Sequence, residues 1–472
     1  RRQSLLRMTG DADVGFTSRT IARLSHMILA DASLHGSISQ RLQCLLGLLV
    51  FMIAAFAIGR LRGERTAVPW RTLVWGVALQ FVFALIVLKT PRFLEVINAA
   101  IDALLGYTRD GAHVVFGNLV DNAVPVTSTT RPATQIGVAQ TGSLFAFFVL
   151  PTIIFFSALT AILYHAGIMQ YVVQGLAWVM SKSMKTSGAE TLSAAANIFV
   201  GQTEAPLMVK PFLAAATHSE LMCVMVGGFA NIASGVLGVY TQWLGPFIRD
   251  AGGHLAAACF ISAPASLLVS KLMVPETQAA VTAGGVEFRV QRIDANLLDA
   301  TTRGTFEGLT LALNVGAMLI AFTAIVALFN GLLGWVGVQT HLTAPDAPRL
   351  TLQQLLGYPL APVAWLTGVA PPDCRAVGSL LGIKTVLNEL LAYQQMQVNF
   401  QANPFFINPR DAVLATYALC GFANFASVGI QIGGISSMAP DRRHDLSRLA
   451  LLAMLGGALA SHMTACVVGV LL

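Results

Sequence analysis

A seven-residue string that occurs twice constrains this chain more than any other feature. Gly-Phe-Ala-Asn-Ile-Ala-Ser at positions 228–234 returns at 421–427 with one position changed. Each copy lies in an apolar stretch and follows a Gly-interrupted apolar segment that holds a carboxylate, Glu204 in the first case and Glu389 in the second. Broken helices with polar groups at corresponding positions in two halves are typical of secondary transporters. The repeat therefore predicts a transport protein with two related halves.

The composition requires a membrane environment for most of the chain. Apolar residues make up 55% of the sequence and charged residues 11%, whereas a soluble domain carries about 25% charged residues. A spanning helix needs about 20 apolar residues. Segments of that kind are predicted at 42–59, 70–89, 145–165, 221–240, 255–274, 309–338, 411–432 and 449–471.

Two further apolar segments, 190–215 and 376–398, are interrupted by polar residues and by Gly or Pro, and we interpret them as re-entrant hairpins. The predicted fold class is therefore an all-α polytopic membrane protein with eight transmembrane helices plus two re-entrant helical hairpins in an inverted repeat. The inversion follows from counting, because the two copies of the string lie on the fourth and seventh spanning segments. Three crossings separate them, and an odd number reverses direction.

An alternative interpretation of the string is ordinary helix packing, since Gly, Ala and Ser let transmembrane helices approach closely. Two copies, each with an Asn and each following a hairpin with a Glu, favour a functional repeat. The net charge of +6 does not require nucleic acid, because Lys and Arg fall mostly in loops, where they set topology. Their distribution predicts that both termini lie outside the cell.

The expected organisation divides the chain into five parts. Residues 1–41 form an N-terminal tail that is disordered or not native to the protein, and 42–189 hold scaffold helices and an interfacial helix. Residues 190–274 hold the first hairpin and transport-domain repeat, and 376–472 hold the second. Between them, 275–375 supply a cytoplasmic connection, a scaffold helix and an outer loop. Within these parts, 90–144 is expected to be a polar, loop-like excursion and 340–375 a Pro-rich loop.

The first hairpin concentrates polar and helix-breaking residues inside an apolar segment: Asn197, Gly201, Gln202, Thr203, Glu204 and Pro206. A carboxylate at mid-membrane costs at least about 2.5–3.5 kcal/mol. Where the helix opens, backbone carbonyls become free to bind a cation. This set suits a polar, uncharged solute with a monovalent cation. The alternative is that Glu204 only pairs with a neighbouring lysine, but Lys210 lies six residues on, which is poor helical registration.

The second hairpin places Glu389 beside Asn388. A carboxylate accepts two hydroxyl hydrogens at once, so Glu389 would hold the vicinal diol of a sugar. Lys384 is interpreted as a flank whose long stem reaches the interface. The sequence has no HExxH, Walker or GxSxG motif, so an enzyme is not predicted. Its six cysteines show no CxxC spacing, and we expect small core residues rather than metal ligands or disulfides.

Several long strings resemble the concentrative nucleoside transporter family. They are Gly-Gln-Thr-Glu-Ala-Pro-Leu at 201–207, Lys-Thr-Val-Leu-Asn-Glu at 384–389, Cys-Gly-Phe-Ala-Asn-Phe at 420–425, Gly-Ile-Gln-Ile-Gly-Gly at 429–434, and the stretch 147–159. The resemblance covers about 42–472. It implies a homotrimer of eight-helix protomers that moves nucleosides into the cell with a sodium or proton gradient by an elevator-like displacement.

The resemblance also implies site residues. Gln202, Thr203 and Glu204 would face the base, with Val236 and Phe422 as apolar walls, and Glu389, Asn424 and Ser427 would hold the ribose. Side chains of Asn197 and Thr203, with carbonyls of Val200, Asn231 and Ile232, would hold sodium. Two positions depart from the family pattern: Asn231 stands where Ser or Thr is more common, and Leu390 where Phe is usual.

The sequence thus predicts a cation-coupled nucleoside symporter of a cell inner membrane, with no cofactor and no nucleic-acid partner. Asn197 beside Thr203 favours sodium as the coupling ion. The alternatives are proton coupling, with Glu204 or Glu389 as the proton carrier, and a nucleoside-binding channel or receptor. A channel should have a continuous polar lining along at least one helix, and none of the eight segments has one.

Overall fold

The computed structural model describes residues 36–61, 63, 68–120, 123–127, 135–140, 145–283, 294–340 and 351–472. Helices make up nearly all of this part of the chain, as expected for apolar segments whose backbone groups must be satisfied internally in lipid. Most of the predicted tail, 1–35, lies outside the described residues.

The described part of residues 38–184 holds six helices, one 3-10 turn and a strand pair. The elements are α2 (Ile38–Leu61), α3 (Trp70–Lys89), α4 (Pro91–Phe116), η1 (Gly117–Val120), β1 (Ala123–Thr127), β2 (Gln135–Gln140), α5 (Phe145–Phe148), α6 (Leu150–His165) and α7 (Ile168–Met184).

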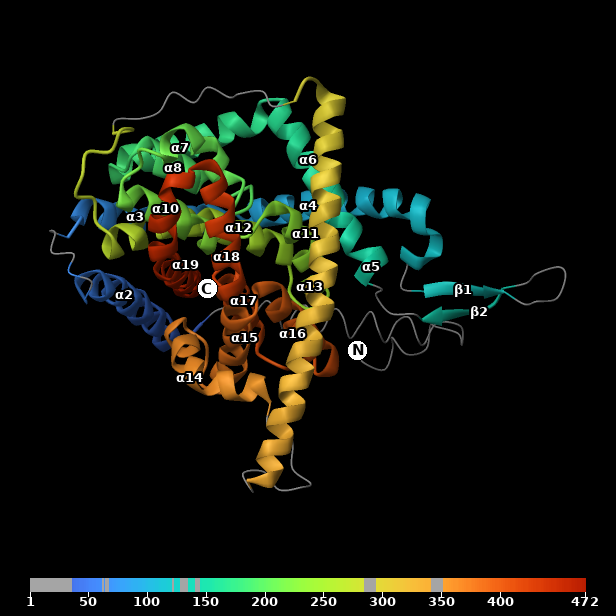
Figure 1. Ribbon diagram of the computed structural model, residues 1–472. Coiled ribbons are helices and arrows are strands. Elements are labelled where there is room, and N and C mark those ends of the chain that lie inside the picture. Colours follow the sequence, from blue (N-terminus) through green and yellow to red (C-terminus); the bar gives the residue numbers. More distant parts are fainter. Residues whose placement is uncertain are drawn as a thin grey trace, which may run out of the picture.

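One expectation for this region was wrong. Segment 90–144 is not loop-like, because 91–116 forms the amphipathic helix α4, which begins with Pro91 at a position that Pro favours. The described chain is helical as expected, apart from the short strands β1 and β2, which pair antiparallel and project away from the helices in Figure 1. Scattered polar residues suggested a loop, but in α4 they share one face of a helix whose other face buries Ile101 and Ala112.

Two runs of helices repeat the same order. The first run is α8 (Gly188–Ala196), η2 (Ala205–Val209), α9 (Lys210–Leu213), α10 (His218–Ala230), α11 (Ser234–Leu244) and α12 (Ala251–Met273). The second is α15 (Cys374–Val386), α16 (Glu389–Ala402), α17 (Pro409–Leu419), α18 (Phe425–Met438), η3 (Pro440–Arg442) and α19 (Arg443–Leu471). Helix α10 of the first run corresponds to α17 of the second, and α12 corresponds to α19. Helix α10 packs against α19 and α17 packs against α12, so the same contact forms in both directions between the halves.

The repeated string lies where a helix breaks in both halves. Helix α10 ends at Ala230 and α11 begins at Ser234, while α17 ends at Leu419 and α18 begins at Phe425. The two corresponding asparagines have extended backbones, with φ −120° and ψ 164° at Asn231 and φ −145° and ψ 162° at Asn424. Segments 221–240 and 411–432, each expected to be one spanning helix, are therefore two helices joined at an extended residue.

Between the two runs lie α13 (Leu297–Gln339) and α14 (Leu352–Leu366). Helix α13 packs against α6 and runs along one side of the molecule from top to bottom (Figure 1). Its 43 residues give a length of about 64 Å, roughly twice the apolar thickness of a bilayer. The loop expected at 340–375 contains α14, which begins with a capping box between Thr351 and Gln354.

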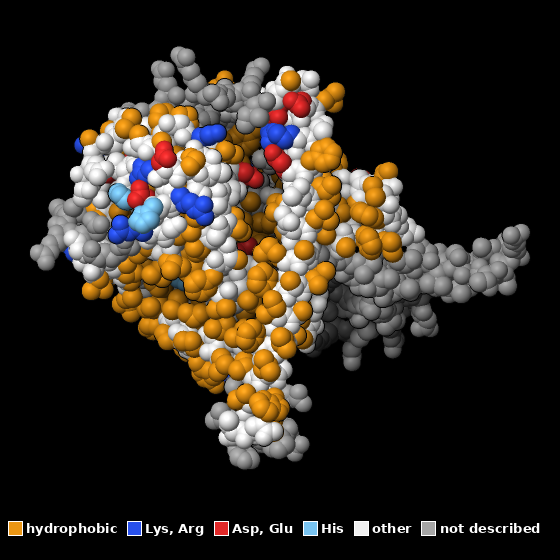
Figure 2. Space-filling view, in the orientation of Figure 1, with side chains coloured by type: hydrophobic (Ala, Val, Ile, Leu, Met, Phe, Trp, Pro, Cys, Tyr) orange, Lys and Arg blue, Asp and Glu red, His pale blue; other side chains and the backbone are white. Residues whose placement is uncertain are grey.

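Within the described residues, six helical segments are long and apolar enough to span a membrane when α10 and α11 are counted as one span (His218–Leu244). The count is seven if α6 and α7, which meet at a 78° bend, are also one span. The predicted count of eight stays a prediction, because α18 is a shorter apolar helix of 14 residues. Figure 2 shows an apolar surface over the lower part of one face, with charged side chains gathered toward its upper end. This separation of apolar and charged surface is what a spanning protein needs.

Candidate functional site

The carboxylate of Glu389 is the centre of the candidate site. Glu389 is the first residue of α16, whose N-cap is Asn388, and its side chain is 5% exposed. The Tyr240 hydroxyl donates to Oε1 and the Asn424 amide Nδ2 donates to Oε2, both over 3.0 Å. Donors from both repeats therefore converge on one buried carboxylate, as an unpaired buried charge requires.

Asn424 is held in one orientation by the start of α18. Its Oδ1 accepts the backbone N–H of Ser427 over 2.8 Å, which caps the helix. This contact fixes Nδ2 on the opposite side of the amide, where it meets Glu389. The sequence predicted Glu389, Asn424 and Ser427 as one ribose-binding group, and the structure brings these three residues together.

Gln202 joins the first hairpin to this group. Its Nε2 donates to Ser427 Oγ over 3.2 Å, and its Oε1 accepts from Gln431 Nε2 over 3.2 Å. Both partners lie on α18, so the loop after α8 contacts the second repeat directly. Gln202, Ser427 and Gln431 are all buried, which makes this a polar seam between the two halves.

The remaining predicted substrate residues are more spread out. Val236 is buried on α11, one turn before Tyr240 on the same face. Phe422 is half-buried at the break before α18, and Thr203 is half-buried beside Gly434. The side chain of Glu204 is exposed, and its Oε2 accepts the N–H of Gly201 over 3.0 Å. Glu204 is therefore an accessible residue of the loop that carries Gln202.

The residues predicted to hold sodium lie in two segments that meet. A Cβ at Gly201 would lie 3.5 Å from Ala233 Cβ, so the loop after α8 touches the break between α10 and α11. Val200, Ile232 and Asn231 are buried there. The backbone carbonyl of Asn231 accepts a bond from Phe422 N over 3.3 Å, and a carbonyl oxygen retains a second lone pair.

Asn197 fits a cation ligand. Its Nδ2 donates to the Ser193 carbonyl over 3.1 Å, and in the part of the chain that the structure describes its buried Oδ1 has no hydrogen-bond partner. A buried acceptor without a donor is rare and suits a positive ion. The Asn231 side chain does not offer its oxygen in this way, because Oδ1 accepts a bond from the Ser262 hydroxyl on α12.

The expectation for Lys384 was wrong. Its side chain does not reach the interface but is 2% exposed, and Nζ donates to the Ala418 carbonyl over 2.9 Å. Helix α17 ends one residue later, and the last carbonyls of a helix have no partner within it. Lys384 satisfies one of them, which ties α15 to the end of α17.

Sequence reasoning missed Tyr240, Gln431 and Ser262 as members of the site. Gln431 could have been suspected as a lone amide inside an apolar helix. Tyr240 and Ser262 gave no signal, because one aromatic or one hydroxyl residue in a spanning helix is unremarkable in sequence. The six cysteines are all buried. Among the described residues, no group of His, Cys, Asp and Glu could hold a metal ion.

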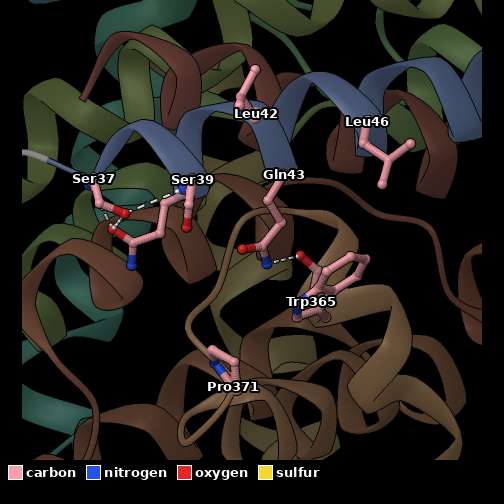
Figure 3. Close-up of a pocket in the computed structure, with 8 residues that line it drawn as sticks. Ser37, Ser39, Leu42, Gln43, Leu46, Trp365 and Pro371 are labelled. Carbon is pink, nitrogen blue, oxygen red and sulfur yellow. Dashed lines mark hydrogen bonds between the residues drawn. The ribbon is translucent and has the colours of Figure 1, made fainter.

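A separate cavity lies away from these residues. It has a volume of about 620 Å³ where the start of α2 meets the loop after α14, and Figure 3 shows Ser37, Gln43, Trp365 and Pro371 around it. Gln43 Nε2 donates to the Val369 carbonyl over 3.0 Å there. None of the predicted site residues lines this cavity.

Three family models match the chain in sequence order. They are "Na+ dependent nucleoside transporter N-terminus" at 46–119, "Nucleoside recognition" at 146–247 and "Na+ dependent nucleoside transporter C-terminus" at 254–469. The chain is 40% identical over 440 residues to sodium/nucleoside cotransporter 1 of Rattus norvegicus and 37% identical to solute carrier family 28 member 3 of the same species. Each alignment covers 90% of this chain, but the chain spans only 63% and 58% of those proteins.

Solved structures agree. CNTnw in an inward-facing substrate-bound state is 35% identical, with a TM-score of 0.79 over 91% of this chain and 97% of that chain. A doubly substituted CNTnw in an outward-facing state gives 35% identity and a TM-score of 0.81 over 92% and 98%. The chain therefore belongs to the sodium-dependent, concentrative nucleoside transporter family, a family of transporters and not of enzymes.

Proposed function

We propose that this protein is a sodium-coupled symporter that imports nucleosides across a cell inner membrane. The observation that carries the proposal is the buried Glu389 carboxylate, which receives donors from Tyr240 and Asn424 and lies in one polar group with Ser427 and Gln202. Its oxygens can accept the two hydroxyls of a ribose. The neutral Gln202 can hydrogen-bond an uncharged base.

The sodium site would be formed by Asn197 Oδ1 with carbonyls of Val200, Asn231 and Ile232. The unpartnered oxygen of Asn197 supports this assignment, as does the contact between Gly201 and Ala233 that brings the two carbonyl-bearing segments together. The proposed hydroxyl ligand, Thr203, remains part of the set. Sodium is preferred over a proton because Asn197 Oδ1 has no hydrogen-bond partner among the described residues, and an uncharged acceptor oxygen suits a metal cation.

Transport would proceed by an elevator-like displacement of the two repeats within a homotrimer, with eight spanning helices and two re-entrant hairpins per protomer. The reciprocal packing of α10 on α19 and α17 on α12 supports a two-fold relation between the halves. The division of the chain into scaffold and transport parts also stays a proposal. Helices α2 and α3, assigned to the scaffold, pack against α12 and α19 of the repeats, and α6 packs against both α13 and α11.

Uptake of labelled uridine into proteoliposomes tests this function. Sodium and proton gradients are imposed separately, and vesicles without the protein provide the background. We expect uridine accumulation that follows the sodium gradient and competition by adenosine but not by free uracil. Accumulation that follows only the pH gradient would replace sodium with a proton, and no accumulation under either gradient would reject the symporter.

A further inference from the structure

The amide of Gln431 lies at the end of a hydrogen-bonded relay across the polar seam. Its side chain is fully buried, and Nε2 donates to two acceptors, the Met225 backbone carbonyl over 3.1 Å and Gln202 Oε1 over 3.2 Å. Gln202 Nε2 in turn donates to Ser427 Oγ over 3.2 Å. The four groups form one chain from α10 through α18 to the first hairpin and back to α18.

The direction of this relay is fixed at one end. An amide side chain can usually turn either its oxygen or its nitrogen toward a neighbour, but a backbone carbonyl only accepts. The Met225 carbonyl therefore requires the Gln431 nitrogen, and this nitrogen requires the Gln202 oxygen. Gln202 must then present its nitrogen to Ser427. As a result, Gln202 keeps one free N–H, and the Ser427 hydroxyl keeps its hydrogen for donation.

Space for the relay comes from a glycine of the repeated string. A Cβ at Gly228 would lie 2.5 Å from Gln431 Nε2 and 3.0 Å from Gln202 Cβ. Among the residues that the structure describes, Gln431 Oε1 has no hydrogen-bond partner. A buried amide with one end unpaired is costly, so packing alone does not account for a glutamine here.

We propose that Gln431 is a positioning residue for substrate recognition. By fixing the amide of Gln202, it makes the binding site present two donors, the second N–H of Gln202 and the hydroxyl of Ser427, to a nucleoside. The assignment rests on the proposed function. It goes beyond that function by stating which face of Gln202 is offered and which residue sets it.

The test measures uridine binding to the purified protein by calorimetry, at saturating sodium. Gln431→Leu keeps the approximate volume and removes the donor, and we expect the Kd for uridine to rise about three- to tenfold. Gln80→Leu is the matched control. Gln80 is also fully buried in a spanning helix with an unpartnered Oε1 among the described residues, but its Nε2 bonds only the Gly76 carbonyl of its own helix, so its Kd should stay within about twofold.

A double-mutant cycle separates positioning from simple packing. Gln202→Met removes the group through which Gln431 acts, so adding Gln431→Leu to it should raise the Kd by less than about twofold. Gly228→Ala gives a second variant that keeps the Gln431 amide, because its Cβ would lie 2.5 Å from Gln431 Nε2 and 3.0 Å from Gln202 Cβ, and so would disturb the contact between the two glutamines from the other side. It should raise the Kd for uridine at least threefold, which keeps the assignment testable if the Gln431→Leu protein does not fold.

An unchanged Kd in both Gln431→Leu and Gly228→Ala, or fully additive effects of Gln431→Leu and Gln202→Met, would overturn the assignment while leaving the proposed function intact. Wild-type protein that binds no uridine would overturn the proposed function and the assignment with it.

Discussion

Asn424 and Glu389 join the beginning of one helix to the beginning of another. The side-chain oxygen of Asn424 caps α18, and its nitrogen donates to the carboxylate of Glu389, the first residue of α16, over 3.0 Å. A residue of the repeated string thus determines where the carboxylate of the second hairpin lies. The position of Glu389 depends on two local helix starts, so the geometry of the site is as well defined as the helices themselves.

Replacement of Glu389 by Gln should abolish or severely weaken uridine uptake while the protein still inserts. The amide places an N–H group against one of the two donors, Tyr240 or Asn424, and removes the charge. Loss of a charged acceptor costs about 1.5–3 kcal/mol, or roughly ten- to a hundredfold in affinity. Initial rates of uridine uptake in proteoliposomes measure this effect.

Two comparisons sharpen that prediction. Tyr240→Phe removes one neutral donor and should reduce the affinity for uridine by less than Glu389→Gln does. Glu307→Gln removes an exposed carboxylate and should leave it unchanged. Near-normal uptake by the Glu389→Gln protein would remove this residue from the site.

Replacement of Asn197 by Ala should raise the sodium concentration that gives half-maximal uptake, because it deletes the unpartnered oxygen. Gly227→Ala should have an effect in the same direction, since its Cβ would lie 3.0 Å from Asn197 Nδ2. Asn231→Ser should change sodium dependence little, because the proposed ligand at that position is the backbone carbonyl. The measurement is uridine uptake as a function of sodium at fixed pH, and equal sodium dependence in wild type and Asn197→Ala would contradict the site.

Lys384→Met should destabilise the protein, because the Ala418 carbonyl loses its donor in a buried environment. An unsatisfied buried group costs about 1–3 kcal/mol. Thermal unfolding in detergent should show a lower Tm, with Lys182→Met, on an exposed lysine, as the control that remains within about 0.5 kcal/mol. A wild-type Tm in the Lys384→Met protein would indicate that the lysine has no structural role.

Asp294 gives a prediction about pH. Arg303 donates to both of its carboxylate oxygens, over 2.7 and 3.0 Å, which lowers the pKa of Asp294. A lowered pKa means that the stabilisation is present above the unfolded pKa of about 3.9 and is lost as the pH falls through the folded value. Asp294→Asn should therefore lower Tm slightly at pH 7, by the equivalent of about 1 kcal/mol or less, and this difference should vanish at strongly acidic pH. A difference that is the same at both pH values would exclude the ion pair as its cause.

The signal for Glu389 is local, because a carboxylate next to Asn388 in a broken apolar segment stands out from its neighbours. Asn424 and Ser427 were assigned to the same group by the family resemblance. The structure places the three residues together, and their role in holding a ribose stays a prediction. Hydropathy placed the long helices α2, α3, α12 and α13 within a few residues, except where α13 extends before 309.

The features that differ from the sequence-based expectations depend on tertiary contacts, or on a helical periodicity of polar residues that is weaker than the hydropathy signal. Lys384 is buried because the Ala418 carbonyl at the end of α17 accepts its hydrogen bond. The residues around position 384 in the sequence do not indicate this contact. Gln431 acquires its importance from Gln202, 229 residues away. The number of polar residues in α4 predicts a loop, whereas their placement on one face of the helix accounts for the helix that forms.

The two glycines at the end of α10 have a thermodynamic consequence. Gly227 faces Asn197 and Gly228 faces Gln431 and Gln202, so two adjacent backbone positions form a wall shared by the proposed ion and substrate sites. If an ion bound at this wall favours nucleoside binding, the two ligands are thermodynamically coupled. By reciprocity, sodium must strengthen nucleoside binding by the same factor by which nucleoside strengthens sodium binding. A single helical turn, at the end of α10, would then couple the binding of the two ligands.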